Sequence, residues 1–292
     1  GVYTSCIDLF IKILIASEDP VVLSSLIFMV AAETLGISDS RVDAIADTLI
    51  ITPPPGGYME GEVIIEFIEG QTTLGYQLEP DIWSFFVDIT PPDLEFAYPS
   101  DWEMLPEPVF TAIVLAFDEL AGVDTASAIA YFVVEGETLD AQTSVEPYGG
   151  EWRVVIPSVA EISPADSVSI ALYICDDVEI VCDSNCVWSQ VSFWIEPNFP
   201  CSLSTNPITP NDDGYNDKVM FYYPKPYSTS VKLCIYDLGG REMFCRDISS
   251  GNIKDMTWDG TRKGKKLPAG TYLYIISRDG EPYCRGTITV AR

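Results

Sequence analysis

The sequence predicts an all-β protein made of small β-sandwiches that follow one another along the chain. Short runs rich in β-branched and aromatic residues alternate with Pro, Gly and Asp turn formers, and the same runs recur later in the chain. With 292 residues, 47% of them hydrophobic, the chain is long enough for two or three domains of about 100 residues.

Strand-like segments of the first part of the chain match later segments in the same order. The matched pairs are residues 24–30 with 126–132, 33–35 with 137–139, 47–53 with 151–157, 63–67 with 168–172, and 83–88 with 191–196. The offset drifts only from 102 to 108 residues, so we interpret these segments as two copies of one module. Short alternating strands with turns between them fit an immunoglobulin-like sandwich in each copy.

Two proline-containing segments separate the modules. Pro91 and Pro92 cannot donate to a strand ladder and hold the backbone extended, and residues 196–200 contain a second such joint. The predicted domains are therefore residues 1–90, 91–197 and 198–292, all immunoglobulin-like sandwiches, in an elongated rod.

The first module lacks a segment that the second one has. Residues 93–98 read as the opening strand of the second module, and their counterpart would fall before residue 1. One interpretation is a truncated sequence, or a first module for which residues 2–4 suffice. The other is that a neighbouring subunit supplies the strand by β-augmentation, which would polymerise the protein head to tail.

The last module contains its own strand signals. Residues 231–236 and 242–245 flank Gly239 and Gly240, which tolerate positive φ in a hairpin turn. An aromatic and β-branched run at 272–276 predicts a further strand, and Asp279-Gly280 precedes a closing strand at 285–290. These elements predict a small antiparallel sandwich.

Five ordered motifs in this module closely resemble the gliding-motility-associated C-terminal domain, the type B sorting domain of the type IX secretion system. They are Thr-Pro-Asn-Asp-Asp-Gly-Tyr-Asn-Asp (209–217), Ile-Tyr-Asp-Leu-Gly-Gly-Arg-Glu (235–242), Trp-Asp-Gly-Thr (258–261), Leu-Pro-Ala-Gly-Thr-Tyr-Leu-Tyr (267–274) and Gly-Thr-Ile-Thr-Val (286–290). The resemblance implies export through a bacterial outer membrane to the surface or medium, and implies no chemical activity. Leu238 departs from the aromatic that the family more often has, which keeps the related hook-capping immunoglobulin-like family as an alternative. The first two modules resemble tandem bacterial Ig-like domains, on the evidence of the segments at residues 118–125 and 87–92.

Charge divides unevenly along the chain. Residues 1–200 contain three Lys/Arg against 34 Asp/Glu, a formal charge of −31, whereas residues 201–292 contain 13 against ten, a charge of +3. One interpretation is an acidic ectodomain with an ordinary tail. The other is a basic end that docks on the acidic body of another copy or on anionic lipopolysaccharide. An acidic surface of this kind argues against nucleic acid as a partner.

Eight cysteines in a chain without histidine favour disulfides over zinc sites, and hence an oxidising compartment. If Gly239 and Gly240 are the two turn residues, Cys234 lies opposite Cys245, which leaves Cys201 for Cys284. The second module contains three cysteines, Cys175, Cys182 and Cys186, so they cannot all pair with one another. Cys6 therefore crosses between modules or bonds another chain, unless two thiols stay free.

Oxygen-bearing side chains crowd the turn at Gly214. Asn211, Asp213, Asn216 and Asp217, with Asp212, have the composition of a Ca²⁺ site, although the spacing of an EF-hand is absent. The alternative is an Asx-rich turn whose side chains bond backbone amides. No other cofactor is expected.

Catalysis has little support, and we expect no enzyme. Without histidine there is no Ser-His or Cys-His pair, and no nucleotide-binding or nucleophile-elbow motif occurs. Trp102 and Trp152 are the tryptophans considered for glycan stacking. Three Asp-Ser/Thr-aliphatic triplets, at Thr48, Thr125 and Ser167, resemble the O-glycosylation motif of type IX-secreting bacteria.

These observations favour an extracellular structural protein of a bacterium, a subunit of a surface filament or layer that assembles head to tail. The alternatives are a monomeric adhesin that binds a cell-surface polysaccharide, and the non-catalytic C-terminal part of a larger secreted enzyme. The sequence begins Gly-Val-Tyr without a basic n-region and has no run of 18 apolar residues. We therefore expect a mature or trimmed chain without a membrane span.

Overall fold

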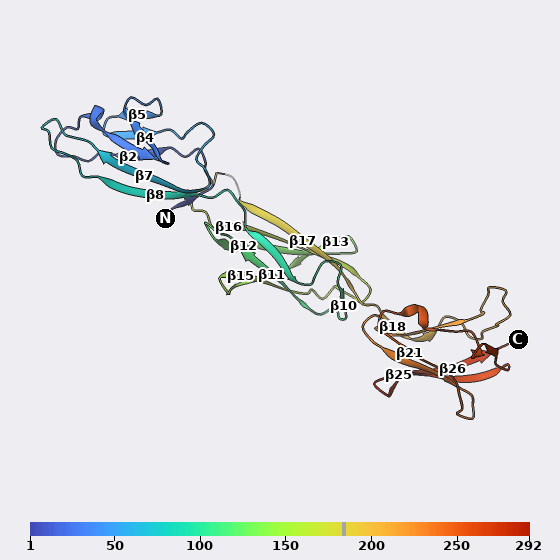
Figure 1. Ribbon diagram of the computed structural model, residues 1–292. Coiled ribbons are helices and arrows are strands. Elements are labelled where there is room, and N and C mark those ends of the chain that lie inside the picture. The colour runs from blue at the N-terminus through green and yellow to red at the C-terminus, as the bar shows by residue number, and fades with distance from the viewer. Residues whose placement is uncertain (183–184) are drawn as a thin grey trace.

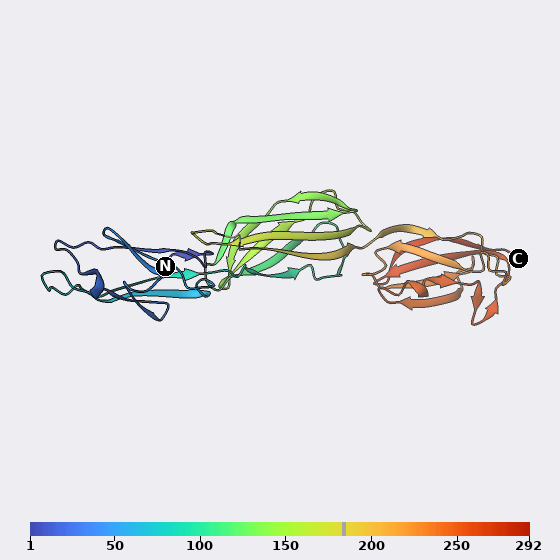
Figure 2. The same cartoon turned by 90° about the horizontal axis from the view of Figure 1, so that it is seen from above.

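The computed structural model describes residues 1–182 and 185–292, which are almost entirely strands and loops. Three lobes lie in a line and make an elongated rod (Figure 1, Figure 2). Each lobe has its own hydrophobic core, drawn from residues 11–87, 105–195 and 208–290. The protein is therefore all-β and consists of immunoglobulin-like sandwiches in tandem.

The first lobe packs a five-stranded sheet against a three-stranded one. The strand orders are β1-β8-β7-β3-β4 and β2-β6-β5. The strands are β1 (Tyr3–Thr4), β2 (Ile11–Leu14), β3 (Ile27–Val30), β4 (Glu33–Gly36), β5 (Val42–Ile45), β6 (Thr48–Ile51), β7 (Gly61–Glu69) and β8 (Asp81–Val87), with a short 3-10 helix η1 (Leu23–Ser25) before β3.

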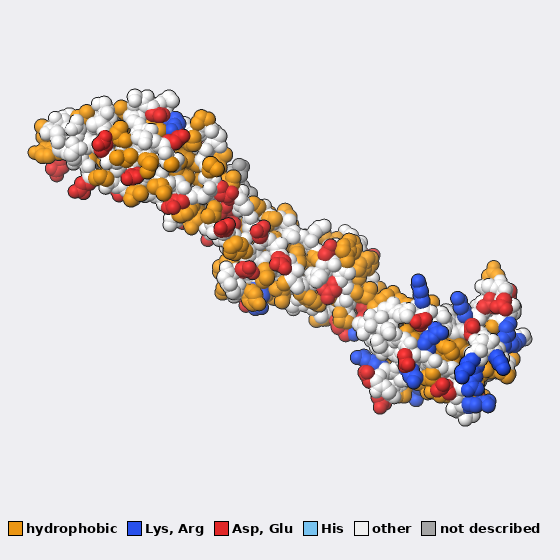
Figure 3. Space-filling view, viewed as in Figure 1, with side chains coloured by type: hydrophobic (Ala, Val, Ile, Leu, Met, Phe, Trp, Pro, Cys, Tyr) orange, Lys and Arg blue, Asp and Glu red, His pale blue; other side chains and the backbone are white. Residues whose placement is uncertain are grey.

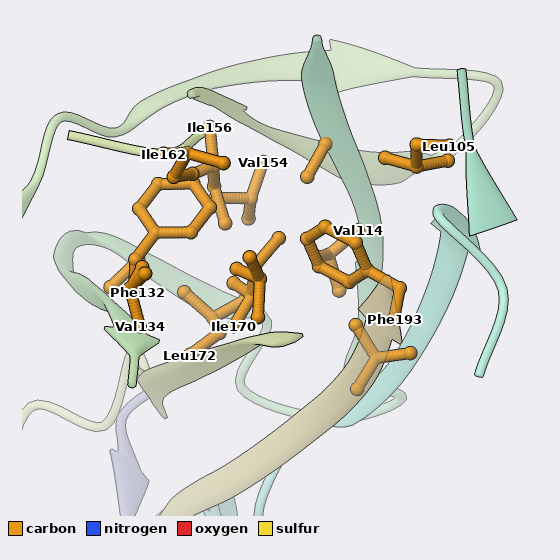
Figure 4. Close-up of a cluster of buried hydrophobic side chains, with 14 of the residues drawn as sticks. Leu105, Val114, Phe132, Val134, Val154, Ile156, Ile162, Ile170, Leu172 and Phe193 are labelled. Carbon is orange, nitrogen blue, oxygen red and sulfur yellow. The ribbon is translucent and has the colours of Figure 1, made fainter. Parts of the chain in front are cut away.

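The second lobe has the orders β10-β17-β16-β12-β13 and β14-β15-β11-β9. Its strands are β9 (Asp93–Tyr98), β10 (Met104–Leu105), β11 (Thr111–Phe117), β12 (Val123–Val134), β13 (Glu137–Ala141), β14 (Ser144–Tyr148), β15 (Glu151–Pro157), β16 (Ser167–Asp176) and β17 (Cys186–Ile195). Side chains of both sheets alternate inward and outward and meet in one core, which Figure 4 shows in close-up.

The third lobe has the orders β18-β19-β22, β21-β20-β25-β26 and β23-β24. Its strands are β18 (Asn198–Leu203), β19 (Val219–Pro224), β20 (Val231–Tyr236), β21 (Glu242–Ile248), β22 (Thr257–Trp258), β23 (Thr261–Arg262), β24 (Lys265–Lys266), β25 (Gly270–Arg278) and β26 (Glu281–Val290), with 3-10 helix η2 (Ile253–Asp255) before β22. The strands expected from 231–236, 272–276 and 285–290 lie in β20, β25 and β26.

The first two lobes repeat one plan except at one edge. β1 lies parallel to β8 just as β10 lies parallel to β17, and sheet β2-β6-β5 corresponds to β11-β15-β14. β9 adds a fourth strand beside β11, and no strand of the described residues occupies that place beside β2. Residues 2–4 do not replace it, because they form the counterpart of β10.

The sequence match of residues 47–53 with 151–157 is wrong by one residue. Ile51 is buried opposite Ile11 in the same way that Ile156 is buried opposite Ala112. A slip of one residue turns every side chain of a strand to the other face, so burial fixes the register where sequence similarity does not.

The turn between β20 and β21 is longer than the two glycines predict. The Asp237 N–H donates to the Arg241 carbonyl at 3.0 Å, and the register shifts between Ile235 and Tyr236. The bulge compensates for the longer turn, so Cys234 still lies directly opposite Cys245.

We predict that Phe132→Ala destabilises the second lobe by about 3–5 kcal/mol, because it leaves a cavity between the two sheets. Phe132 is fully buried on β12, and Phe110 packs edge-on against its ring. Ile129→Ala on the same strand is the control, since Ile129 is exposed. Equal losses for both variants in denaturant unfolding would contradict this description of the core.

Candidate assembly sites: the module joints and an open sheet edge

The joint between the first two lobes is crosslinked through the N-terminal segment. The N–H of Ile180 donates to the Tyr3 carbonyl at 3.2 Å, and the N–H of Ser5 donates to the Ile180 carbonyl at 3.1 Å. The Cys6–Cys182 disulfide closes the same contact across 176 residues of sequence. The N-terminus therefore lies at this joint instead of at the tip of the rod (Figure 1).

Each joint also uses a buried carboxylate that follows the last strand of a lobe. Asp88 Oδ2 accepts a hydrogen bond from the Ala121 N–H at 2.8 Å, and Glu196 Oε1 accepts from the Tyr227 and Ser228 N–H groups at 2.7 and 2.9 Å. The acceptor comes from one lobe and the donors from a loop of the next. Hydrogen bonds of this charge-assisted kind are stronger than neutral ones.

Asp88 and Glu196 are equivalent positions of the repeat. The Asp88 N–H donates to the Thr4 carbonyl and the Glu196 N–H to the Leu105 carbonyl, both at 2.8 Å. The sequence match of residues 83–88 with 191–196 ends on these two acids. That match is the sequence signal for the joint, but it does not distinguish these two residues in a chain with 44 Asp and Glu residues.

The first joint gathers three carboxylates. Oxygens of Asp88, Asp118 and Asp176 lie within 4.8 Å of one another, and the Asn185 amide donates to both Asp176 Oδ2 and the Asp88 carbonyl at 2.6 Å. Burial raises the pKa of Asp176 to about 6, and the charges of Asp88 and Asp118 add to the effect. Burial also raises the pKa of Asp88. Carboxylate oxygens suit Ca²⁺, but an acidic cluster alone does not define a site.

The second joint has a further ion pair and a buried tyrosine. Lys225 of the third lobe pairs with Glu107 of the second. The Tyr223 hydroxyl donates to the Thr229 carbonyl at 3.1 Å, and burial, with the nearby Glu196 carboxylate, raises the pKa of Tyr223 to about 12. Both joints are therefore made of specific contacts as well as proline.

The open edge of β2 borders a groove of about 550 Å³ in the first lobe. Leu26 and Phe28 form its buried floor, while Ile13 and Ile15 line the edge side. Trp83 of β8 lines the opposite wall. The groove lies where β9 would lie in the second lobe.

All eight cysteines are in disulfides. The pairs are Cys6–Cys182, Cys175–Cys186, Cys201–Cys284 and Cys234–Cys245. Cys6 thus crosses between modules, one of the options left open by the cysteine count. Cys234–Cys245 is the pair expected from the strand register, and Cys201–Cys284 is the pair that this left in the last module.

The loop expected to bind calcium has an extensive hydrogen-bond network of its own. Asp217 accepts bonds from the N–H groups of Asn211, Asp212 and Gly214, and Asp213 Oδ1 accepts from the Tyr215 N–H. These backbone bonds lower the pKa of Asp217. The geometry is that of the Asx-rich turn. Calcium binding by Asn211, Asp213, Asn216 and Asp217 stays a prediction.

The triplet residues differ in exposure. Thr125 and Ser167 are exposed, whereas Thr48 is half-buried. Glycosylation at these residues stays a prediction.

The burial of the tryptophans differs from what the sequence predicted. Trp152 packs on the core of the second lobe, while Trp102 is exposed. Sequence reasoning missed Trp188, which is 56% exposed and stacks with Tyr131 and Tyr173 on neighbouring strands. Only the strand pairing brings these three rings together.

Basic side chains gather on the third lobe (Figure 3). The hairpin β23–β24 and its turn contribute four of them: Arg262, Lys263, Lys265 and Lys266. All four are exposed. The charge difference seen in the sequence is thus a difference between the two ends of the rod.

Comparison with protein families assigns the third lobe. Residues 202–290 match the CHU_C type IX secretion signal domain. The chain therefore carries the export signal of this system and is directed to the cell surface or the extracellular space. In the described residues, 1–182 and 185–292, no helix is long and apolar enough to span a membrane. No curated protein matches the chain.

Several solved structures are similar to this chain at low identity. Dimeric latent PorU from Porphyromonas gingivalis matches with 16% identity and a TM-score of 0.25, over 97% of this chain and 30% of that one. The tetra-tandem repeat of a large adhesion protein matches with 13% identity and a TM-score of 0.32, over 98% and 69% of the two chains. The ectodomain of mouse nectin-like molecule 4 matches with 12% identity and a TM-score of 0.33, over 99% and 96%. This chain spans less than a third of PorU, and TM-scores this low do not bear on function.

We predict that Asp176→Asn raises the melting temperature at pH 7.5 and changes it little at pH 4. The folded-state pKa of Asp176, about 6, lies above the unfolded value of 3.8. The stability that its proton contributes is therefore complete below about pH 3.8 and is lost as the pH rises through 6. The asparagine keeps a neutral acceptor for Asn185.

Thermal unfolding at both pH values measures the effect, with Asp177→Asn as the matched control because Asp177 is exposed. An equal rise for both variants would mean that net charge, and not the buried cluster, is responsible.

Proposed function

We propose that this protein is a non-enzymatic structural protein of a bacterial surface, a subunit that assembles head to tail into a filament or layer. The premise is the type IX secretion signal domain at residues 202–290, which directs the chain outside the cell. The observation that carries the proposal is a rod with locked joints and opposite charge at its two ends.

Joints that are held by covalent and polar contacts favour a structural role for the rod. A disulfide, a backbone ladder and the Asp88 carboxylate join the first two lobes, and Glu196 with the Lys225–Glu107 pair joins the next two. A rod held in this way keeps the distance between its ends, which a filament subunit requires.

Opposite charge at the ends favours contact between copies. The exposed basic hairpin β23–β24 lies on the third lobe, whereas the first two lobes have almost no basic residues. Such surfaces attract each other over about one Debye length, roughly 8 Å at physiological salt. Head-to-tail order follows because like ends repel.

We predict that replacing Arg262, Lys263, Lys265 and Lys266 with Glu abolishes assembly of the full chain, since it gives both ends the same charge. Electron microscopy and sizing chromatography at low salt measure the assemblies. Exchanging the same four residues between Lys and Arg is the charge-preserving control. Filaments of the Glu variant that equal those of the wild type would overturn the head-to-tail contact, and isolated rods at all salt concentrations for the wild type would overturn the assembly itself.

A second candidate function, glycan adhesion, has one specific observation in its favour. Trp188 of β17 stacks with Tyr131 of β12 and makes a tilted contact with Tyr173 of β16, with ring centroids 6.1 and 4.9 Å away. An exposed Trp188 ring flanked by two half-buried tyrosines suits the apolar face of a sugar ring. The acidic surroundings favour a neutral polysaccharide.

If this second function holds, the chain is retarded in native gels that contain a neutral β-glucan or mannan, and Trp188→Ala removes the retardation. Trp102→Ala is the control, because Trp102 is exposed and does not stack on another aromatic ring of residues 1–182 and 185–292. Equal migration of the wild type with and without either polysaccharide would count against adhesion through this face.

A further inference from the structure

Two of the four disulfides close loops that contain most of the chain. Cys6–Cys182 closes a loop with residues 7–181, which include the whole core of the first lobe and strands β9–β16 of the second. Cys201–Cys284 closes another loop, with strands β19–β25 of the third lobe. The Cα atoms of the two pairs lie only 5.0 and 5.6 Å apart. A loop whose ends are held this close cannot be drawn out by a pull on the chain outside it.

The shortest covalent path along the chain therefore leaves out most of the fold. It runs from Cys6 across the first disulfide to Cys182, along the backbone to Cys201, and across the second disulfide to Cys284. Only residues 182–201 lie between the two bridges.

The strands on this path are already extended. Residues 182–201 contain all of β17 (Cys186–Ile195) and the first part of β18 (Asn198–Leu203), and β26 (Glu281–Val290) continues beyond Cys284. β17 runs along the second lobe from the first joint toward the second (Figure 1). A strand rises about 3.2–3.4 Å per residue, and a fully stretched chain rises at most about 3.6 Å per residue. Tension along the path can therefore lengthen it only slightly.

Both ends of the path are held in place. β1 pairs with β8, and the Ser5 N–H donates to the Ile180 carbonyl, so the N-terminal segment is fixed at the first joint. At the other end the Ala291 N–H donates to the Ile208 carbonyl, beyond the last residue of β26. The path therefore extends from the first joint to the far end of the third lobe, where Figure 2 also places the C-terminus.

We propose that the chain is a tension-bearing tether, in which a pull between the N-terminal segment and the last strand passes through two disulfides and strands β17, β18 and β26. The rest of each lobe carries no tension. In a row of sandwiches without such bridges, tension passes through every domain, and each domain lengthens the row when it unfolds. This protein instead keeps its length under tension. The property belongs to a single chain and does not depend on assembly, so it goes beyond the proposed function.

Single-molecule force spectroscopy on the full chain, with handles attached through peptide tags at Gly1 and Arg292, tests the tether. Residues 1–6, 182–201 and 284–292 lie outside the closed loops, and these 35 residues stretch to about 120 Å. All 292 residues would stretch to about 1,000 Å. We expect the wild type to stay within the shorter limit. Steps of several hundred ångströms in the wild type would overturn the tether.

Removing the first bridge should release the first two lobes. Cys6→Ser combined with Cys182→Ser should add about 570 Å, because Cys175–Cys186 then keeps only a short segment closed. Cys175→Ser combined with Cys186→Ser is the matched control. It removes a disulfide of the second lobe but leaves the path intact, so the extension should equal that of the wild type.

Removing the second bridge should release the third lobe. Cys201→Ser combined with Cys284→Ser should add about 250 Å. The control is Cys234→Ser combined with Cys245→Ser, which removes a disulfide inside the closed loop and should add nothing.

Thermal unfolding of each variant shows whether it is folded before it is pulled, and for a variant that is not folded the limit of about 120 Å in the wild type still decides. No added length in either path variant would mean that packing and hydrogen bonds bear the tension, which contradicts the tether. Equal added length in a path variant and its control would contradict it as well. Filament formation does not enter this measurement, so its result and that of the assembly experiment are independent.

Discussion

The rod depends on how the last strand of one lobe is held by the next lobe. A sandwich has no large apolar face to offer its neighbour, because its core lies between its own sheets. The contact must therefore be polar, and a carboxylate that accepts backbone N–H groups supplies direction as well as energy. Asp88 and Glu196 do this at equivalent positions, with Ala121 and with Tyr227 and Ser228.

The two joints nevertheless differ. The first adds a disulfide and a short parallel bridge between Thr4 and Ile180, so the N-terminal segment belongs structurally to both lobes. Burial raises the pKa of Asp88 and of Asp176 at this joint, and the nearby charge of Asp118 adds to both shifts. The second joint has one buried carboxylate, Glu196, and a separate ion pair between Lys225 and Glu107. The stability that protonated Asp176 contributes to the first joint is therefore lost as the pH rises through about 6.

The other constraint on the molecule is that backbone N–H and C=O groups at the edges of its sheets need hydrogen-bond partners. In the second lobe β9 covers the edge of β11 and contributes three apolar side chains to the core. In the first lobe the same edge is open and the same core is partly uncovered, at Ile13 and Ile15. Within residues 1–182 and 185–292, the two lobes thus differ in whether this sheet edge and the adjacent apolar side chains are covered.

The sequence by itself determined the all-β class, the tandem repeat and the family of the last module, since alternation, turn residues and ordered motifs are local signals. The Gly239-Gly240 turn in the sequence also indicated the Cys234–Cys245 pair. This pair is present although the turn is longer than the two glycines imply, because the bulge near Tyr236 restores the register. Tertiary structure alone decided the register of β6, the role of Asp88 and Glu196 among 44 acids, and the stack around Trp188. Each of these depends on which face a side chain takes or which lobe it meets, and such contacts between distant segments leave no periodic trace in the sequence.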